Sequence, residues 1–180
     1  MQRRDCFTEI IDSGQRREFQ TGAVRDCDEN KGRCDLLPLD IVSGLIKFWS
    51  LPYELKDIPV LDSIYMFLSQ PLKHKIDDDL IFNAIYMFCI ERGWLIPDAV
   101  LEVSKHFADG CKKYGERNWE KGIPAHCYID SAIRHYIKWI RTDEDEPHDR
   151  AFVWNLLCLL WTLRHKPECN DLWSDDNGHG

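Results

Sequence analysis

The stretch H-D-R-A-F-V-W-N-L-L-C-L-L-W-T-L-R, residues 148–164, decides the fold of this 180-residue chain. Its apolar residues occupy nearly every side of a helix, which is typical of a helix buried at the centre of a bundle. Asn155 is its one notable interior polar residue. It follows His148 by seven residues, or two helical turns, so both side chains face the same way. The stretch therefore predicts the central helix of a helical bundle.

The neighbouring segments also show apolar residues at spacings of three and four, the period of a helix. They predict helices over residues 38–48, 60–68, 77–92, 97–114 and 127–141. No segment has a convincing strand period, and the sequence contains no phosphate-binding glycine loop or dinucleotide fingerprint. The predicted fold class is all-α, a helical bundle without a sheet of three or more strands. Leu61, Ile64, Tyr65 and Leu68 carry this spacing in the short helix. In the helix from 127 the spacing predicts an inward face made of Ile129, Ala132, Ile133, Tyr136, Ile137 and Ile140.

Length and composition narrow the class of protein. We expect one domain over residues 1–170, an irregular arm at its beginning, and a disordered polar tail over residues 171–180. The net charge of -8 argues against a nucleic-acid polymer or an anionic membrane as partner. Eight cysteines without a C-x-x-C pair, and no apolar run long enough to cross a bilayer, predict a protein of the reducing cytoplasm.

Residues 113–155 crowd cations, carboxylates, histidines and amides among aromatic residues. Polar groups within core-like helices cost free energy unless they have partners. A phosphate ester with a divalent metal ion would be a suitable partner, because Arg and Lys hold phosphate oxygens and carboxylates hold the metal. The alternative is a salt-bridge network between helix ends. The arm over residues 22–33 is likewise either a basic arm that closes over an anion or a solvated loop. The acidic triplet at 77–79 indicates a helix cap.

Four blocks of sequence resemble one family. They read T-G-A-V-R-D-x-D-E-N-K-G-R-x-D-L-L-P, K-Y-G-E-R-N-W-E-K-G-I-P, D-S-A-I-R-H and H-D-R-A-F-V-W-N, and they lie within residues 21–38 and 106–165. The blocks are similar to the bacteriophage and prophage dATP/dGTP diphosphohydrolases of the N-terminal-domain type. The segment from about 40 to 97 resembles a helical insertion carried by a subset of that family. The family is thought to be related to the all-α, MazG-like nucleotide pyrophosphohydrolases, so the resemblance implies a MazG-like bundle.

The resemblance also implies an activity. Such an enzyme would use Mg²⁺ or Mn²⁺ to hydrolyse dATP or dGTP to the monophosphate and pyrophosphate, in the host cytoplasm if it is phage-encoded. The E-E-x-x-E motif of MazG-like enzymes is absent from the sequence, and the E-x-x-D from Glu146 to Asp149 stands at a helix start. The candidate metal ligands are Asp130, Glu144, Glu146 and His148. His135, as general base, and Asp130 are the candidate catalytic residues. The candidate substrate or phosphate ligands are Lys31, Arg33, Lys113, Tyr114, Arg117, Asn118, Trp119, Lys121, Arg134 and Asn155.

Two of these residues keep alternative interpretations. Trp119 either stacks on a base or packs in the core, and Asn155 either binds a purine edge or satisfies His148 within the protein. The function has alternatives too: a protein that sequesters a nucleotide, including a host defence signal, without hydrolysing it, or a purely structural module. We also expect a homo-oligomer, most simply a dimer, because apolar residues occupy more than one face around residues 60–92. The residues expected to be exposed there, besides the inward stripes, are Tyr65, Met66, Phe67, Tyr86 and Met87.

The loop before His148 predicts how the candidates group in space. Helices joined by six residues should be antiparallel neighbours. One group is then expected at the loop end: Glu144, Glu146 and His148, near Lys138 and Arg141. The other is expected nearer the opposite end, where Asp130 and Arg134 would face the loop at residues 117–121.

Overall fold

The computed structural model describes residues 16–26, 31–50, 57–70 and 77–173. The chain divides into two compact units, residues 1–31 and 32–180, and the second contains the six α-helices of the described residues. The single domain expected over residues 1–170 stays a prediction. The described part of the chain is mostly helical, with only a two-stranded hairpin besides, which confirms the predicted all-α class.

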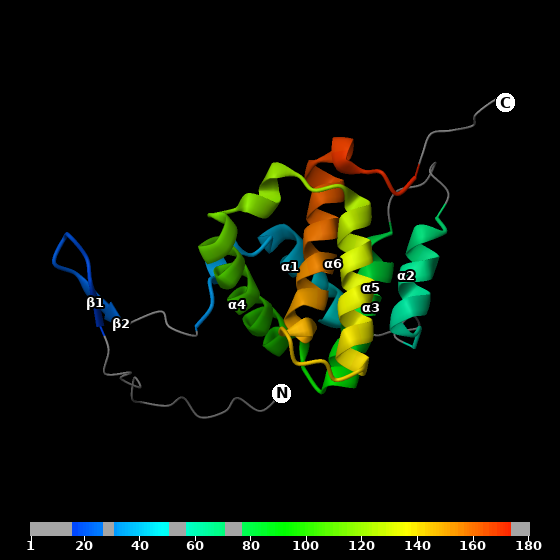
Figure 1. Cartoon of the computed structure of the whole chain (residues 1–180), viewed down its shortest axis with the longest axis horizontal. Coiled ribbons are helices and arrows are strands. Elements are labelled where there is room, and N and C mark those ends of the chain that lie inside the picture. The colour runs from blue at the N-terminus through cyan, green and yellow to red at the C-terminus, as the bar shows by residue number, and fades with distance from the viewer. Residues whose placement is uncertain (1–15, 27–30, 51–56, 71–76, 174–180) are drawn as a thin grey trace. The chain divides into compact units, whose positions relative to one another are not determined.

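Helix α6 (His148–His165) lies at the centre of the second unit (Figure 1). Apart from Trp154 and Asn155, the residues from 151 to 160 are at most 1% exposed. Burying this many apolar side chains is the main favourable contribution to folding. The predicted central helix is confirmed, since four others contact it: α1 (Leu39–Ser50), α3 (Asp78–Arg92), α4 (Ile96–Tyr114) and α5 (Ala125–Ile140).

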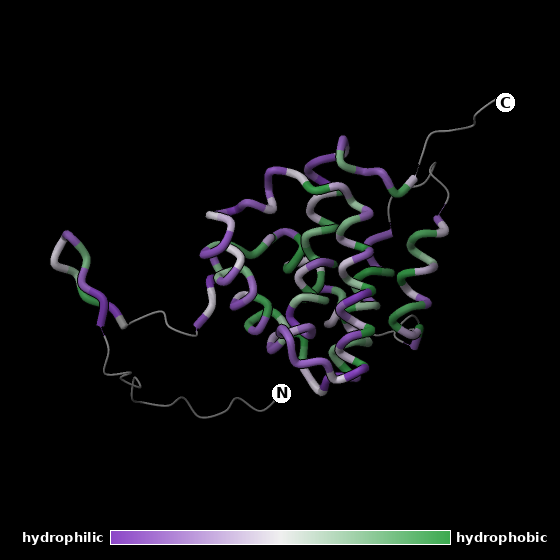
Figure 2. Tube along the Cα trace, viewed as in Figure 1, coloured by the Kyte–Doolittle hydropathy of each residue, from purple (hydrophilic) through white to green (hydrophobic). Residues whose placement is uncertain are grey.

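Helices α5 and α6 pack side by side and run in opposite directions, as predicted from the short loop (Figure 1). Figure 2 shows that this loop is hydrophilic, whereas hydrophobic segments gather in the helices. The predicted inward face of α5 is wrong at Ile137 and Ile140, which are 46% and 57% exposed. Apolar residues form two adjacent stripes on this helix. Spacing therefore could not select the stripe that contains Ile129, Ala132 and Tyr136, which is the buried one.

Helix α2 (Val60–Leu68) forms as predicted, and of its residues predicted to be exposed, Tyr65 and Met66 are exposed whereas the prediction is wrong for Phe67. Leu61 and Tyr65 are 43% and 70% exposed, whereas Val60, Ile64 and Phe67 are buried. Seven of its nine residues are apolar, so several faces satisfy helical spacing. The neighbours decide the face: α2 packs on α3, and the Phe67 ring contacts Trp173 at 5.4 Å.

The segment expected to be an insertion belongs to the same hydrophobic core as the rest of the second unit. Ile41 and Leu45 of α1 and Ile85 and Phe88 of α3 are fully buried. Phe88 contacts Phe152 of α6 with ring centroids 4.5 Å apart. At the start of α3, the Asp77 carboxylate accepts a hydrogen bond from the Asp79 amide, which confirms that the acidic triplet caps the helix.

The first unit contains a hairpin where an arm without regular structure was predicted. Strand β1 (Arg16–Glu18) pairs antiparallel with β2 (Val24–Asp26). Gly22 turns the chain with φ 79°, a conformation that glycine adopts without steric cost. The sequence could not reveal these strands because three residues are too few to show an alternating pattern.

The last described residues are ordered. Asp171 accepts a hydrogen bond from the His126 backbone amide, and the Trp173 indole donates to the Leu68 carbonyl oxygen at 3.1 Å. The tail expected to be disordered from residue 171 therefore begins with three packed residues, and residues 174–180 lie outside the described part. No single helix of the described residues is long and apolar enough to cross a bilayer. Helices α3 and α4 taken together, with a bend of 97° between them, have the length and the composition that a membrane span needs.

Candidate functional site

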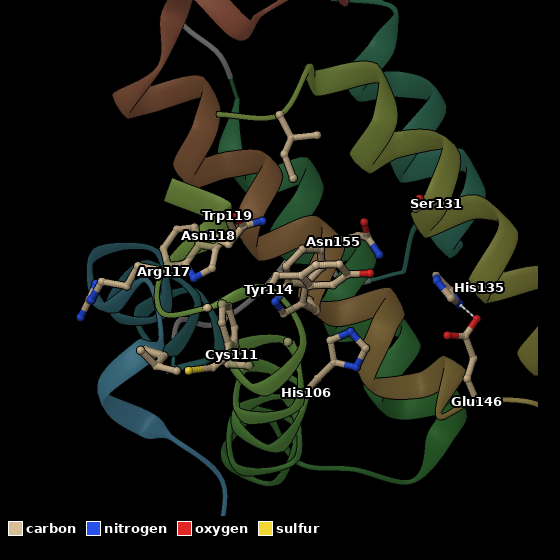
Figure 3. Close-up of a pocket in the computed structure, with 16 residues that line it drawn as sticks. His106, Cys111, Tyr114, Arg117, Asn118, Trp119, Ser131, His135, Glu146 and Asn155 are labelled. Atoms are coloured by element: carbon tan, nitrogen blue, oxygen red, sulfur yellow. Dashed lines mark ion pairs between the residues drawn. The ribbon is translucent and has the colours of Figure 1, made fainter. Parts of the chain in front are cut away.

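A cavity of about 410 Å³ opens between α4, α5, α6 and the loop that carries the short helix η2 (Asn118–Lys121) (Figure 3). Its volume lies in the range of small-molecule sites, roughly 300–1,000 Å³, and like them it combines aromatic walls with a few polar groups. The aromatic wall residues are Phe107, Tyr114, Trp119 and Trp154. The polar residues around it are His106, Arg117, Asn118, Ser131, His135, Glu146 and Asn155.

The aromatic wall is built by packing between helices. The Phe107 ring contacts Trp119 at 5.6 Å and Trp154 at 5.9 Å, and Trp119 also contacts Trp161 at 4.8 Å. Trp119 is only 5% exposed, so its ring belongs to the core, as one of its two interpretations states. It nevertheless lines the cavity, and stacking on a base stays a prediction.

Asn155 is buried in the same wall. Its amide nitrogen donates to the Ala151 carbonyl oxygen of the preceding turn at 2.8 Å. The ring nitrogens of His148 contact His135 and Asp145, so the alternative in which Asn155 satisfies His148 is not the arrangement in the structure. Contact with a purine edge remains a prediction for Asn155.

Arg117 holds the loop beside the cavity. Its φ of 50° lies in the left-handed region, which residues other than glycine rarely adopt. The guanidinium donates to the Glu120 carboxylate and, at 2.8 Å, to the Asp35 carbonyl oxygen. The second bond ties the loop to the short helix η1 (Cys34–Leu36). A strained backbone persists only when its surroundings hold it, and such strain is common at binding sites.

The segment before η1 is fixed against α4. A Cβ on Gly32 would lie 2.1 Å from the Ser104 hydroxyl oxygen, and the Arg33 amide donates to the Ser104 carbonyl oxygen at 3.0 Å. The Arg33 guanidinium contacts the carboxylates of Asp35 at 2.6 Å and Glu116 at 2.8 Å. Its hydrogen bond lowers the pKa of Asp35, and both carboxylates raise the pKa of Arg33. Arg33 is thus engaged by two acids and is not among the residues around the cavity.

One edge of the cavity carries a cluster of two histidines and a carboxylate. His135 Nδ1 lies 3.0 Å from His148 Nδ1, and Glu146 Oε1 lies 3.6 Å and 3.7 Å from these two nitrogens. His135 and Glu146 point toward one another in Figure 3. The side chains of His135 and His148 are 14% and 1% exposed. Among the described residues these three could hold a metal ion.

Asp145 links one histidine of the cluster to Lys138. Its carboxylate lies 2.7 Å from His148 Nε2 and 2.7 Å from the Lys138 amine. These hydrogen bonds, that of Lys138 first, lower the pKa of Asp145 to about 2, so it is ionised near neutral pH. Asp143, Asp145 and His148 form a second group that could hold a cation.

Burial keeps the imidazoles beside the cavity neutral. It is the largest cause of the lowered pKa of His135, and the nearby His148 adds to the effect. Burial also lowers the pKa of His106, followed by the effect of His135. Neutral imidazole is the form that binds metal ions and accepts protons.

Three predicted site residues lie apart from this cluster. Asp130 and Arg134 pair with each other on the exposed face of α5, with side chains 65% and 53% exposed. Neither they nor Glu144 belong to the groups that could hold a metal, although Glu144 lines a separate outer groove. The predicted grouping of Glu146 and His148 near Lys138 does occur, with Asp145 as the bridge between His148 and Lys138.

The predicted phosphate ligands are also spread out. Arg117 and Asn118 line the cavity beside Tyr114, whereas Lys113 and Lys121 are exposed on the flanking segments. A hydrogen bond with Tyr114 is the main cause that raises the pKa of Lys113. Lys31 ends the first unit and is exposed.

Sequence reasoning missed His106 and Asp145. His106 precedes Gly110 and Tyr114 by one and two helical turns, and all three line the cavity. That spacing was available in the sequence and could have grouped them. Asp145 stands three residues before His148, a spacing that lets a carboxylate reach a histidine at the start of a helix.

Comparison with known proteins gives one family match, over the second half of the chain. Residues 83–172, which are 90 of the 180 residues, match the family described as dATP/dGTP diphosphohydrolase, N-terminal. The match contains the histidine cluster and every residue around the cavity except Leu36, whereas the block at 21–38 lies outside it. No curated protein and no solved structure matches the chain. The chain thus belongs to the dATP/dGTP diphosphohydrolase family, through a domain of the N-terminal type.

Proposed function

We propose that this protein hydrolyses a purine deoxynucleoside triphosphate, dATP or dGTP, to the monophosphate and pyrophosphate with the help of a divalent metal ion. Family membership supports a nucleotide as the ligand. The observation that carries the proposal is a single cavity with aromatic walls and with His135 and Glu146 at its edge. Aromatic side chains suit a base, and the cluster suits the ion that phosphate chemistry requires. One continuous site would thus hold the base and the reacting phosphorus.

The residues present fit a divalent ion. Two imidazoles and a carboxylate converge within a few ångströms, and Asp145 orients one of the imidazoles. An ion bound there polarises a phosphate oxygen and lowers the pKa of water. In this proposal Glu146 and His148 keep their predicted role as ligands, and His135 acts as a ligand instead of a general base. Asp130 and Glu144 have no part in it.

The protein's own cations would position the phosphates. Arg117 already stands at the cavity with its guanidinium beside Glu120, so a phosphate could take the place of that carboxylate. Asn118 lines the cavity next to it, and Lys113 and Lys121 flank it. The neutral His106 is a candidate acceptor for a proton from the attacking water.

Assembly into a homo-oligomer is part of the proposal. Tyr65 and Met66 of α2 are 70% and 44% exposed, as the predicted contact surface requires, although Phe67 is buried. Light scattering at micromolar concentration should give a dimer or a larger mass. A monomer mass would contradict this part alone.

Hydrolysis is tested by incubating the protein with a panel of deoxynucleoside and nucleoside triphosphates and cyclic nucleotides, with Mg²⁺ or Mn²⁺, and separating the products by chromatography. We expect dAMP or dGMP with pyrophosphate. Glu146→Gln should abolish the product, and Glu144→Gln, a change of the same chemistry two residues away, should not. Bound but intact nucleotide would favour sequestration, and absence of binding would leave a structural module.

A further inference from the structure

The histidine cluster has the dimensions of a metal site. The separations between His135 Nδ1, His148 Nδ1 and Glu146 Oε1 are 3.0, 3.6 and 3.7 Å. A point equidistant from the three atoms lies about 2.0 Å from each, and metal–imidazole and metal–carboxylate bonds are roughly 2.0–2.2 Å long. An ion could therefore bond to all three atoms with little movement of the side chains.

The donor atoms select the kind of ion. Mg²⁺ prefers oxygen ligands and keeps several waters, whereas imidazole suits ions of the first transition series and Zn²⁺. Two histidines with one carboxylate also leave coordination positions open for a substrate oxygen or water. We propose that His135, His148 and Glu146 form a transition-metal site that binds Mn²⁺, Co²⁺ or Zn²⁺ in preference to Mg²⁺.

Asp145 prepares the site. It accepts a hydrogen bond from His148 Nε2, which leaves His148 Nδ1 with a lone pair on the side facing His135 and Glu146. Carboxylates commonly orient metal-binding histidines in this way. The His148 side chain is 1% exposed, so the surrounding packing also limits its rotation. Asp145 is therefore a positioning residue for the metal ligand.

The alternative group, Asp143 with Asp145 and His148, is the weaker candidate. Asp145 is 57% exposed and already contacts the Lys138 amine, whose positive charge opposes a bound cation. The same group would also need His148 Nε2, the nitrogen that Asp145 engages.

The proposed metal site lies between the aromatic cavity and a second groove on the surface. His135 and Glu146 line the aromatic cavity, while Glu146 and His148 line an outer groove of about 700 Å³ that also contains Arg92 and Arg150. An ion in the cluster is thus within reach of a ligand in the cavity. The metal site deepens the proposed function by naming its ion, but it rests on its own geometry and stands whether or not a nucleotide is hydrolysed.

Metal binding is measured directly on the full chain after treatment with a chelator. Isothermal titration with Mg²⁺, Mn²⁺ and Zn²⁺ should show Mn²⁺ and Zn²⁺ bound roughly tenfold or more tightly than Mg²⁺. Co²⁺ should give visible absorption bands of a nitrogen-containing site. Glu146→Gln and His135→Gln should each weaken Mn²⁺ binding, whereas Glu144→Gln and Asp130→Asn should leave it unchanged.

These outcomes separate the metal site from the activity. Equal affinity for Mg²⁺ and Mn²⁺, or Mn²⁺ affinity unchanged in Glu146→Gln, would overturn the site. Circular dichroism of each variant establishes that it is folded, and Glu146 is 44% exposed, so its substitution by the isosteric amide should be tolerated. Tight, selective Mn²⁺ binding without nucleotide hydrolysis would support the site and contradict only the proposed function.

Discussion

Helix α5 contributes neighbouring residues to two polar clusters, and the two clusters differ most in their exposure to solvent. Asp130 and Arg134 form an exposed pair on its outer face, with side chains 65% and 53% exposed. His135, the next residue, turns inward to His148 and Glu146 and is 14% exposed. Charged and titratable residues of one helix thus separate into a solvated ion pair and a preorganised site.

The difference matters because solvent sets the strength of each interaction. An exposed ion pair typically contributes about 0–1 kcal/mol to stability, since water screens the charges and the side chains lose freedom. A buried polar group needs a partner or it costs free energy. In the inner cluster the His148 ring contacts His135 and Asp145, and Glu146 lies close to both histidines. This cluster, and not the outer pair, offers atoms that could bind a metal ion. The proposed function therefore rests on the inner cluster, and the outer pair is left as a surface ion pair.

The sharpest test of this comparison replaces Glu146 by Gln. We expect turnover of dATP or dGTP to fall by roughly 100-fold or more, because a lost electrostatic contribution at the reacting phosphate has that effect. Initial rates measured by chromatography, at saturating Mn²⁺, provide the check. Turnover equal to that of the parent would remove Glu146 from the site.

A smaller effect, on metal affinity, is expected when Asp145 is substituted. Asp145→Asn should weaken Mn²⁺ binding by roughly 10–100-fold, the usual cost of losing the carboxylate that orients a histidine ligand. Titration calorimetry gives the affinity. Asp143→Asn is the matched control and should retain the parental affinity, because the carboxylate that pairs with His148 Nε2 is that of Asp145. Equal losses in both variants would instead indicate a general effect of the acidic loop.

The third prediction concerns acid stability. The pKa of His106 is lowered in the folded protein, so the unfolded chain binds more protons than the folded one as the pH falls through about 6.5. The free energy of unfolding should then decrease from pH 7 to pH 5, by less than about 1.4 kcal/mol per pH unit for this one group. Urea denaturation of the metal-free protein at several pH values measures it. His106→Gln should flatten the dependence, and an unchanged slope would assign it to other groups.

The smallest effect is expected on the outer face. Asp130→Asn should change the free energy of unfolding by less than about 1 kcal/mol, because it breaks only an exposed ion pair. It should leave turnover and Mn²⁺ affinity at the parental values, measured in the same assays. A loss of activity in a folded Asp130→Asn variant would contradict this assignment and would indicate that Asp130 belongs to the site.

Much of the fold could be predicted because helices are local structures. The central helix from His148, the cap at Asp77 and the antiparallel α5–α6 pair all follow from spacing, residue preference or loop length. The burial of Phe67 and the exposure of Ile137 could not be predicted, since several apolar stripes satisfied one period and only the packed neighbours select among them.

The candidate site was predictable in its residue types and its region, but not in its membership. Glu146 and His148 were predicted as ligands from their chemistry and lie in the cluster that could hold a metal ion, while Asp130 satisfied the same chemical criteria and lies outside it. His106 and Asp145 were overlooked because nothing in their identity separates them from the many other polar residues near them. Only the distances between segments, which the sequence does not contain, distinguish the residues at the site from the other polar residues.

The sequence by itself determined the helical class, the family and the stretch that holds the chemistry, because periodicity and motif order are properties of neighbouring residues. Only the tertiary structure decided that His135, Glu146 and His148 meet at the edge of an aromatic cavity and that Asp130 does not. The physical reason is the rotation of α5 about its own axis. Adjacent residues differ by roughly 100° around a helix, so packing against α6 turns His135 inward and leaves Arg134 and Asp130 in water.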